Sequence, residues 1–370
     1  MSTIDVFNPT RLTWARRRRG MTKTRMAASI GVNLRSVSAY ETGEFNPEPE
    51  RLTAIVRTLK FPQSFFFGDD LEEPAIDTAS FRSLSKMTAR QRDTALGSGA
   101  IAMLFNEWIE ARFDLPEPNV PDLGRDANAE SAAAAVRQAW GLSELPIKNM
   151  VHLLESKGVR VYSLAIDAVE VDAFSMWRRD RPFVFLNTLK SAERGRFDAA
   201  HELGHLVLHR HAAPNGQQAE QDANVFASAL LMPPASVRAH APRFATIDNL
   251  MRMKKAWGVS LAAMTYRLHK LDLLSEWHYR KLYIEISSRG YRKKEPNGGP
   301  REVSQVLQKV FSELRAEGIS KEEVAIALHV HPTDIDELVF GLALTCLNGV
   351  RHGTDRSRPM PQLTLVSSRD

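Results

Sequence analysis

The sequence has little of several features that would place a protein in a particular class. It contains one cysteine, Cys346, which excludes an intrachain disulfide and a zinc site built from several thiolates. No apolar run reaches the roughly 18 residues that a membrane-spanning helix needs, and residues 1–10 show no secretory pattern. We therefore expect a cytoplasmic protein that has no membrane segment.

Positive charge is concentrated at one end of the chain. Residues 1–60 hold eleven Lys and Arg against five Asp and Glu, a net charge of +6, whereas the whole chain carries +5. The remaining residues therefore sum to −1. A charge excess that is confined to one end favours an acidic partner for that end, and nucleic acid is the usual one.

Composition divides the 370 residues into several segments and predicts a multidomain, mainly α protein with one α+β domain. The expected segments are a basic, all-α domain at 1–67, a helical linker at 68–127, the α+β domain at 128–275, a helical region at 276–350 and a disordered tail at 351–370. Within the linker, residues 80–112 read as helix.

The α+β domain combines short strands with helices. Residues 159–164, 173–177 and 182–186 have the short, turn-bounded apolar pattern of strands, and a helical period follows them. This order predicts a small antiparallel or mixed sheet that packs on helices.

Two later segments are less definite. Residues 295–300 read as a plain linker. Residues 303–340 could form a second, degraded helix-turn-helix or a helical cap through which the protein dimerises. Basic residues are sparse there, which favours the cap.

The strongest local pattern is His201-Glu202-Leu203-Gly204-His205. Residues four apart lie on one face of a helix, so His201 and His205 can reach the same metal ion. Glu202 lies beside them, where it can act on a water molecule without being a ligand. Two histidines on an inner helix face could also be satisfied core residues, so a third ligand decides between the two interpretations.

Glu220 is the candidate third ligand. A turn at residues 214–216 separates it from His205, and it falls on the inward face of the helix that follows. An unpaired carboxylate is costly to bury, and a metal ion removes that cost. Asn224 and Asp198 are the residues that we expect to orient the ligands.

The segment at residues 194–234 resembles the ImmA/IrrE family of bacterial and phage metallopeptidases, and the resemblance extends over about residues 130–275. It rests on His-Glu-Leu-Gly-His, on the spacing of Glu220 and Asn224, on Ala-Asn-Val-Phe-Ala, on Leu-Leu-Met-Pro and on the strand-like Pro-Phe-Val-Phe-Leu-Asn. In that family the two histidines and the downstream glutamate bind zinc. The resemblance therefore implies a zincin-like domain in which His201, His205 and Glu220 hold Zn²⁺.

Three protein ligands leave a fourth position open, which is typical of a catalytic zinc site. Zinc lowers the pKa of water from about 15.7 towards about 7, and we expect Glu202 to take a proton and pass it to the leaving amine. The motif contains no second donor for the oxyanion. The candidates are Tyr266, Arg267, His209 and His211, of which Tyr266 is preferred because its segment resembles that of the family; a core aromatic is its alternative role.

Residues 9–60 contain several short helices. The turn at Gly31-Val32 joins two of them, and the second spans residues 33–42. This is the helix-turn-helix arrangement. The spacing of Ala27, Gly31, Val37 and Tyr40, with the trailing Tyr-Glu-Thr-Gly-Glu-Phe-Asn-Pro-Glu-Pro, resembles the XRE, or lambda-repressor-like, family over about residues 8–67.

In the XRE family the helix after this turn enters the major groove of double-stranded DNA, usually in a homodimer on paired half-sites. The residues that we expect to contact DNA on this helix are Asn33, Arg35, Ser36 and Ser38, with Arg35 suited to guanine. Lys23 and the arginines at 16–19 would meet phosphates.

Together these features predict a DNA-binding transcriptional regulator with a zinc-dependent endopeptidase domain. The family resemblance implies a protein substrate, often a repressor. The alternative is a transcription factor whose zinc domain senses a metal or ligand and cleaves nothing. Glu202 favours the enzyme, because a sensor has no need of it. Another divalent metal could take the place of zinc.

Overall fold

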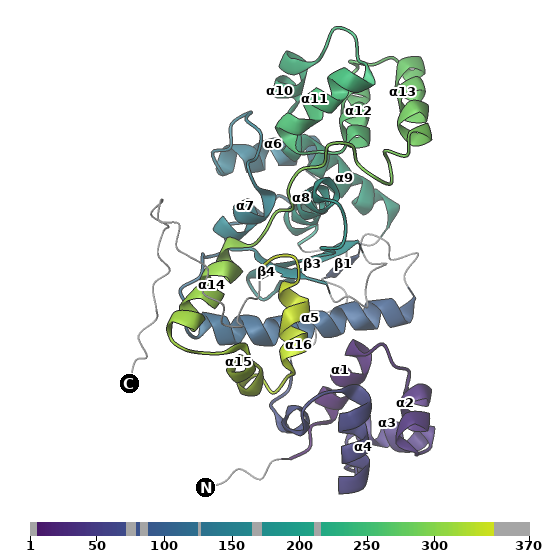
Figure 1. Ribbon diagram of the computed structural model, residues 1–370, viewed down its shortest axis with the longest axis vertical. Helices are drawn as coiled ribbons and strands as arrows, with labels where there is room; N and C mark the ends of the chain where they lie inside the picture. Colours follow the sequence, from purple (N-terminus) through teal and green to yellow (C-terminus); the bar gives the residue numbers. More distant parts are fainter. Residues whose placement is uncertain are drawn as a thin grey trace.

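A computed structural model shows the arrangement of the chain (Figure 1). It describes residues 6–71, 79–81, 88–124, 127–164, 172–210 and 216–343, with the backbone alone at 79–81. The tail that the sequence predicts at 351–370 lies outside these residues, as do Cys346 and His211. No helix in the described ranges is both long enough and apolar enough to span a bilayer.

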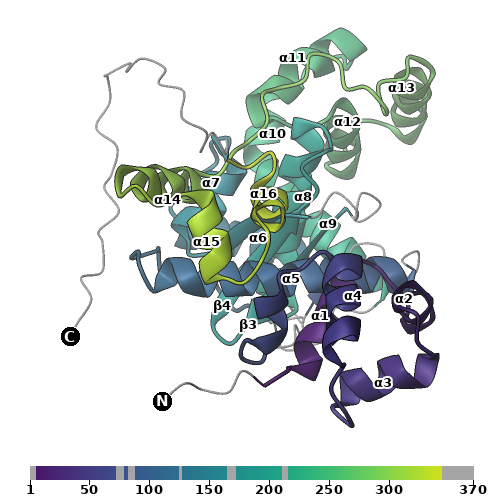
Figure 2. The ribbon, with the colours of Figure 1, turned by 60° about the horizontal axis from the view of Figure 1, so that its bottom comes forward.

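The N-terminal domain is a bundle of short helices that lies at one end of the molecule (Figures 1 and 2). Its elements are α1 (Pro9–Arg18), α2 (Lys23–Ile30), α3 (Leu34–Thr42), α4 (Pro49–Leu59) and the 3₁₀ helix η1 (Gln63–Phe67). Asn33 caps α3 by accepting from the backbone N–H of Ser36. Gly31 ends α2 with φ at 69°, a conformation that glycine adopts without strain, and this turn sets α3 across α2.

The centre of the molecule, among the described residues, is a four-stranded mixed sheet that contains the three strands expected from the sequence and one more. Its strands are β1 (Ala79–Phe81), β2 (Arg160–Ser163), β3 (Ala173–Arg178) and β4 (Arg181–Leu186), in the order β1-β3-β4-β2. Strand β4 pairs antiparallel with β3 and parallel with β2, while β1 pairs antiparallel with β3. The two central strands are thus β3 and β4, and β1 lies at one edge.

Helices cover both faces of the sheet. On one face lies α5 (Ala89–Glu110), where the hydroxyl of Tyr162 on β2 donates to Asn106 at 3.2 Å. On the other face lies α8 (Ala192–Leu208), where the indole N–H of Trp177 on β3 donates to the carbonyl of Leu206 at 3.2 Å. Side chains along a strand alternate between faces, so Ser175 lies on the same side as Trp177 and faces α8.

Helix α9 (Gln217–Leu231) packs closely against α8. The other helices of this domain are α6 (Ala129–Ala139), α7 (Met150–Ser156), α10 (Pro234–His240), α11 (Ile247–Trp257), α12 (Leu261–Lys270) and α13 (Glu276–Ser288). A Cβ at Gly204 of α8 would lie 3.2 Å from the Cα of Ala223 and 3.0 Å from the ring of Phe226, both on α9. Glycine at this position therefore allows the close approach of the two helices.

The C-terminal helices fold back onto the sheet domain. They are α14 (Gln305–Ala316), α15 (Lys321–Ala327) and α16 (Pro332–Val339). Phe311 on α14 stacks on Phe105 of α5 at 6.1 Å, and the Glu155 carboxylate accepts from the N–H of Gln305 at the start of α14 at 2.9 Å. The structure thus uses this region, for which the sequence predicted a dimerising cap or a second helix-turn-helix, to pack within its own chain.

The segment predicted as a plain linker is also held in place. The carboxylate of Glu295 accepts from the N–H of Leu261 at 2.7 Å, and the N–H of Gly299 donates to Glu193 at 2.9 Å. These partners lie on α12 and α8, so the segment is hydrogen-bonded to two helices of the α+β domain. The expectation of a plain linker is therefore wrong.

The prediction of a helix over residues 80–112 is wrong at its start. Helix α5 begins at Ala89, and residues 79–81 form β1 instead. The pairing of β1 with β3 is a contact between distant parts of the chain, so the local apolar period could not show it.

The N-terminal domain is joined to the rest through α1. Arg18 pairs with Glu337 and lies 3.9 Å from Asp334, and Arg19 lies 3.0 Å from Asp334, with both acids on α16. A Cβ at Gly97 of α5 would lie 2.8 Å from the Cα of Arg18, so α1 and α5 are in close contact. This ion-paired contact sets the position of the helix-turn-helix relative to the α+β domain.

We predict that Asp334→Ala lowers the free energy of unfolding by about 3 kcal/mol, because it leaves the buried Arg18 without one of its two acidic partners and removes the acid that pairs with Arg19. Asp336→Ala on the same helix is the matched control. Its pair with Lys321 is far more exposed, and its loss should cost less than about 1 kcal/mol. Urea denaturation of both variants measures the difference, and equal losses would contradict the structural role of Asp334.

Candidate metal centre

Helix α8 carries the histidine motif and is buried along most of its length. It begins at Ser191, whose hydroxyl accepts from the N–H of Arg194 at 3.3 Å. From there to Leu208 the helix lies between the sheet and α9, and the side chains of His201, Glu202 and His205 are 0, 0 and 3% exposed. The motif therefore points into the protein rather than into solvent.

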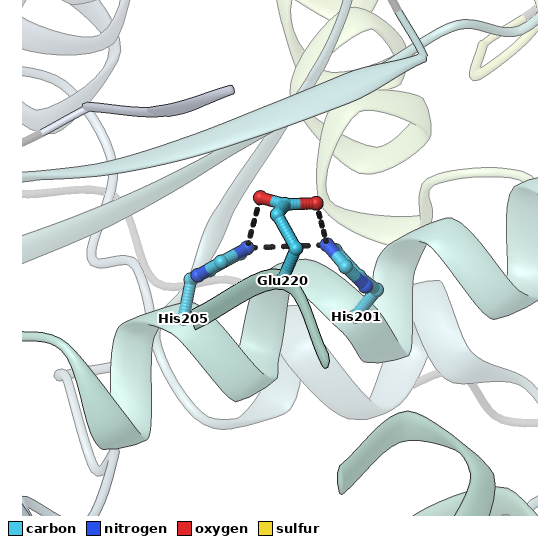
Figure 3. Close-up of side chains that lie close together, drawn as sticks. All are labelled: His201, His205 and Glu220. Carbon is cyan, nitrogen blue, oxygen red and sulfur yellow. Dashed lines mark hydrogen bonds and ion pairs between the residues drawn. The ribbon is translucent and has the colours of Figure 1, made fainter. Parts of the chain in front are cut away.

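Three side chains converge at one point (Figure 3). The Nε2 atoms of His201 and His205 lie 3.1 Å apart, and the carboxylate of Glu220 lies 3.6 Å from the first and 3.3 Å from the second. Glu220 comes from α9, at the end of the helix that crosses α8 near Gly204. The structure thus brings together three residues that the sequence selected as ligands.

The spacing of these atoms fits a metal ion. Zinc binds histidine nitrogen and carboxylate oxygen at about 2.0–2.2 Å, which in a tetrahedral site puts two ligand atoms about 3.3–3.5 Å apart. The three distances lie close to this value, and the ligand atoms all lie within 4.8 Å of one another. The donor set of two imidazoles and one carboxylate is also one that zinc prefers. The residues present therefore fit the metal.

Both histidines are held with Nε2 toward the centre. Asn224 Oδ1 lies 3.2 Å from His201 Nδ1, so it can accept that proton and leave Nε2 as the ligand atom. His209 Nδ1 lies 3.1 Å from His205 Nδ1. Burial lowers the pKa of His209 to about 4, so its neutral ring can accept in the same way. Each ring is thus fixed by a partner on its far side.

Glu220 is ionised in this arrangement. Burial by itself would raise its pKa, but hydrogen bonds and positive charge from His201 and His205, protonated at the Nε2 atoms that face it, outweigh that effect, and the pKa falls to about 2. A cation held at these Nε2 atoms would take the place of those protons. A carboxylate ligand must be deprotonated to bind a cation. The site therefore holds Glu220 in the form that a metal requires.

Glu202 is positioned by the sheet. Ser175 on β3 donates its hydroxyl hydrogen to Glu202 Oε2 at 2.7 Å, and its oxygen also lies 3.2 Å from the Glu202 carbonyl oxygen. Ser175 is 1% exposed. Sequence reasoning missed this residue, although a serine between Phe174 and Met176 in an otherwise apolar strand was an available signal.

Asp198 lies one turn before His201 and is buried. It lies 3.8 Å from Lys190 and 3.9 Å from Arg194, so cations balance its charge. Its expected role in orienting an imidazole stays a prediction.

The structure does not support the expected oxyanion donors. Tyr266 is 42% exposed on α12 and contacts Tyr279 and Lys270, and no described contact joins it to the three ligands. Arg267 is buried and donates to Met232 O at 3.0 Å. Tyr266 packs against Tyr279 of α13, and its expected role as the oxyanion donor stays a prediction. His209 contacts the Nδ1 atom of His205, on the side of the ring away from the cluster. His211 lies outside the described residues.

The side chains predicted to contact DNA lie on or beside α3. Asn33 and Arg35 are exposed, and Ser36 and Ser38 are half-buried. Asn33 and Ser36 are hydrogen-bonded to each other at the helix start, at 3.0 Å. Helix α3 lies at the outer edge of the molecule, away from the sheet (Figure 2). Its surface is therefore open to a partner.

The arginines at 16–19 have largely another role. Arg16 donates to Glu41 and Met21, while Arg18 and Arg19 bind α16. The prediction that they meet phosphates is wrong for these three, because acidic residues and carbonyls of the same chain already bind them. Lys23 pairs with Glu41 at 3.1 Å and is 38% exposed.

Comparison with known families agrees with this geometry. Residues 154–269 match the peptidase M78 family model, described as the IrrE N-terminal-like domain, and residues 12–62 match the helix-turn-helix model. The chain joins a helix-turn-helix domain to an IrrE-like metallopeptidase domain. No curated protein matches the sequence. The first match contains the three converging residues, and the second contains α2 and α3.

We predict that Glu220→Ala lowers the affinity for zinc by more than about 100-fold, because even partners outside the ligand set change affinity 10–100-fold. Asp222→Ala is the control for loss of a carboxylate from the same helix, since Asp222 accepts from Gln218 and lies outside the three-residue cluster. Zinc content after dialysis, read by atomic absorption, measures both. A Glu220 variant that retains one zinc per chain would exclude this carboxylate as a ligand.

Asn224→Ala should weaken zinc binding by about 10–100-fold while leaving the three ligands in place, because His201 loses the partner of its Nδ1. Competition with a chromophoric chelator measures the affinity. Asn224→Asp, which keeps an acceptor oxygen, should restore most of it. An unchanged affinity in the alanine variant would show that Asn224 does not orient His201.

Proposed function

We propose that this protein is a zinc-dependent endopeptidase that acts on a regulatory protein of the repressor type, and that its helix-turn-helix binds double-stranded DNA. The observation that carries the proposal is the convergence of His201, His205 and Glu220 beside a carboxylate, Glu202, that Ser175 holds in place. The matches to an IrrE-like peptidase domain and to a helix-turn-helix domain support it.

The residues support the chemistry of peptide hydrolysis. Zinc, when bound, supplies a Lewis acid that polarises a carbonyl and acidifies water. Glu202 accepts a proton at its carboxylate as water attacks the carbonyl carbon, and it then passes that proton to the nitrogen of the leaving amine. The hydroxyl of Ser175 fixes the orientation of this carboxylate for both transfers. The buried surroundings exclude bulk water from the proton path.

In this proposal the helix-turn-helix localises the peptidase on DNA. Because α1 is held against α5 and α16, the DNA-binding surface and the metal centre belong to one connected body. DNA binding would then concentrate the peptidase at operators, where repressor-type proteins are also bound. A homodimer on paired half-sites is part of this proposal, because a single module of this kind binds weakly.

We predict that the wild-type protein cleaves a repressor encoded near its own gene and that a chelator stops the reaction. Glu202→Gln should keep its zinc and lower the rate by at least about 100-fold, since it removes the general base. Asp222→Ala should cleave at the wild-type rate. Electrophoresis of the substrate and zinc content give both readouts. Zinc binding and promoter binding without cleavage of any neighbour would instead support a metal-sensing regulator.

For the DNA-binding domain, Arg35→Ala should weaken binding to operator DNA by about tenfold or more, because one good contact to a base contributes about 1–3 kcal/mol of discrimination. Arg57→Ala removes the same charge from the exposed side of α4 and is the control, with little expected loss. Fluorescence anisotropy at fixed salt compares the two on operator and random DNA. Equal losses for both variants would show that α3 does not read the sequence.

A further inference from the structure

A cavity lies at the start of α8, apart from the metal ligands. It is bounded by the first residues of α8, by the end of α11 and by the connection between α13 and α14, which passes α8 on its way to the C-terminal helices (Figure 1). Its volume is about 610 Å³, within the range of sites for small molecules. The residues that line it include none of the three that converge at the candidate metal centre. A ligand held there would therefore not compete for those side chains.

The buried charges in the wall of this cavity are paired with one another. Arg196, on α8, forms an ion pair with Glu302. Lys254, near the end of α11, lies 3.1 Å from Glu295 and 3.7 Å from Glu193. Arg196 and Lys254 are both buried. The buried part of the wall thus contributes no excess of positive charge.

Three further cations at the cavity are exposed to solvent. They are Lys148, just before α7, Lys255 on α11 and Arg301 in the connection to α14. Arg301 donates to the carbonyl oxygen of Lys190 at 2.9 Å. Like charges around one opening repel one another, and an anion between them relieves that repulsion. Lysine and arginine side chains bind phosphate, and the first turn of α8 adds the positive end of a helix. The opening therefore favours a ligand that carries phosphate.

Two buried polar atoms in the cavity wall have no hydrogen-bond partner among the described residues. One is Nε of Arg196, which is a donor, and the other is Oε2 of Glu193, which is an acceptor. The two residues are 6 and 5% exposed, and both line the cavity. Buried polar groups are nearly always hydrogen-bonded, because an unmade bond costs free energy. A ligand that presents both an acceptor and a donor would satisfy both atoms.

Each of these two atoms lies beside a glycine of the same wall. A Cβ at Gly258 would lie 3.2 Å from Nε of Arg196, and a Cβ at Gly298 would lie 3.7 Å from Oε2 of Glu193. Gly258 also ends α11 with φ at 63°, so its backbone has a separate need for glycine. Gly298 is not in the left-handed region, so its conformation does not require glycine. The absent side chain at Gly298 leaves room for a ligand beside the carboxylate.

We propose that this cavity binds a nucleotide. The phosphates lie between the three exposed cations, and the base and sugar groups meet Arg196 and Glu193 deeper in the wall. A nucleotide fits because it combines negative charge with hydrogen-bond donors and acceptors in a molecule of suitable size. The inference goes beyond the proposed function and does not depend on it, since no metal ligand and no catalytic residue takes part.

The first test titrates the full chain with ATP, GTP, CTP and UTP in a calorimeter. At least one of them should bind, with about one molecule per chain. Lys148→Gln combined with Lys255→Gln should weaken that binding at least about tenfold, because hydrogen bonds to charged groups are lost. Arg252→Gln combined with Lys270→Gln is the matched control, since it removes two exposed cations from α11 and α12 that do not line the cavity. Absence of binding by all four nucleotides, or equal losses in both double variants, would overturn the proposal.

A second variant tests the cavity without a change of charge. Gly298→Leu places a side chain beside the Glu193 carboxylate and should weaken nucleotide binding, while the protein keeps its zinc and its thermal stability. Gly195→Leu is the matched control, because Gly195 lies on α8 outside the lining and a Cβ there meets nothing within 4 Å. Unchanged affinity in Gly298→Leu would show that the nucleotide binds to surface cations only, and the cavity would be excluded as its site.

Two further measurements separate this site from other ways of binding phosphate. Nucleotides also chelate zinc, so the titration is repeated on protein stripped of zinc by a chelator, and the affinity should be the same. Loss of binding there would assign the phosphates to the metal centre instead. Inorganic tripolyphosphate has the charge but lacks a base and sugar, so it should bind at least about tenfold more weakly. Equal affinity for tripolyphosphate would leave a simple anion site and contradict a nucleotide.

Discussion

The close packing of α8 on α9 is the constraint on which the candidate site depends. Gly204 removes the one side chain that would hold the helices apart, and the approach brings Glu220 against the Nε2 atoms of both histidines. Asn224, on the same helix as Glu220, reaches the other nitrogen of His201. One helix contact therefore brings both the candidate third ligand and the candidate orienting residue of His201 to the site. A larger side chain at Gly204 would separate both from α8 together.

The sheet positions Glu202, the candidate general base of the site. It lies on α8 from the side opposite α9, and through Ser175 it orients the carboxylate of Glu202. Glu202 shares α8 with His201 and His205, but its carboxylate is fixed from the sheet, whereas Glu220 and Asn224 approach from α9. This separation matters for chemistry, because the carboxylate that moves protons can be positioned without altering the geometry of the ligands.

Largely buried charged side chains hold the domains against each other. Arg18 and Arg19 of α1 meet Asp334 and Glu337 of α16, and Glu155 binds the start of α14. A buried ion pair adds little net stability, but it specifies which surfaces meet, since any other arrangement leaves the charges unpaired. The helix-turn-helix is therefore oriented relative to the peptidase domain, as a protein that couples DNA binding to a second activity would require.

The sequence by itself determined the features that depend on neighbours along the chain. Histidines four apart on one helix, the turn at Gly31 between α2 and α3, and the strands β2, β3 and β4 follow from local periodicity and turn chemistry. The proximity of Glu220 to the two histidines could be predicted because an unpaired carboxylate on an apolar stripe is costly to bury without a cation.

Tertiary structure decided the rest. The arginines at 16–19 read as a phosphate-binding run because their acidic partners lie elsewhere in the chain: Glu41 for Arg16, and for Arg19 Asp334, which is 315 residues away. The pairing of β1 with β3, the role of Ser175 and the outward position of Tyr266 are likewise set by contacts between segments far apart in the chain. Local sequence carries composition and period but not the identity of a distant partner, and it is the partner that fixes what each of these residues does.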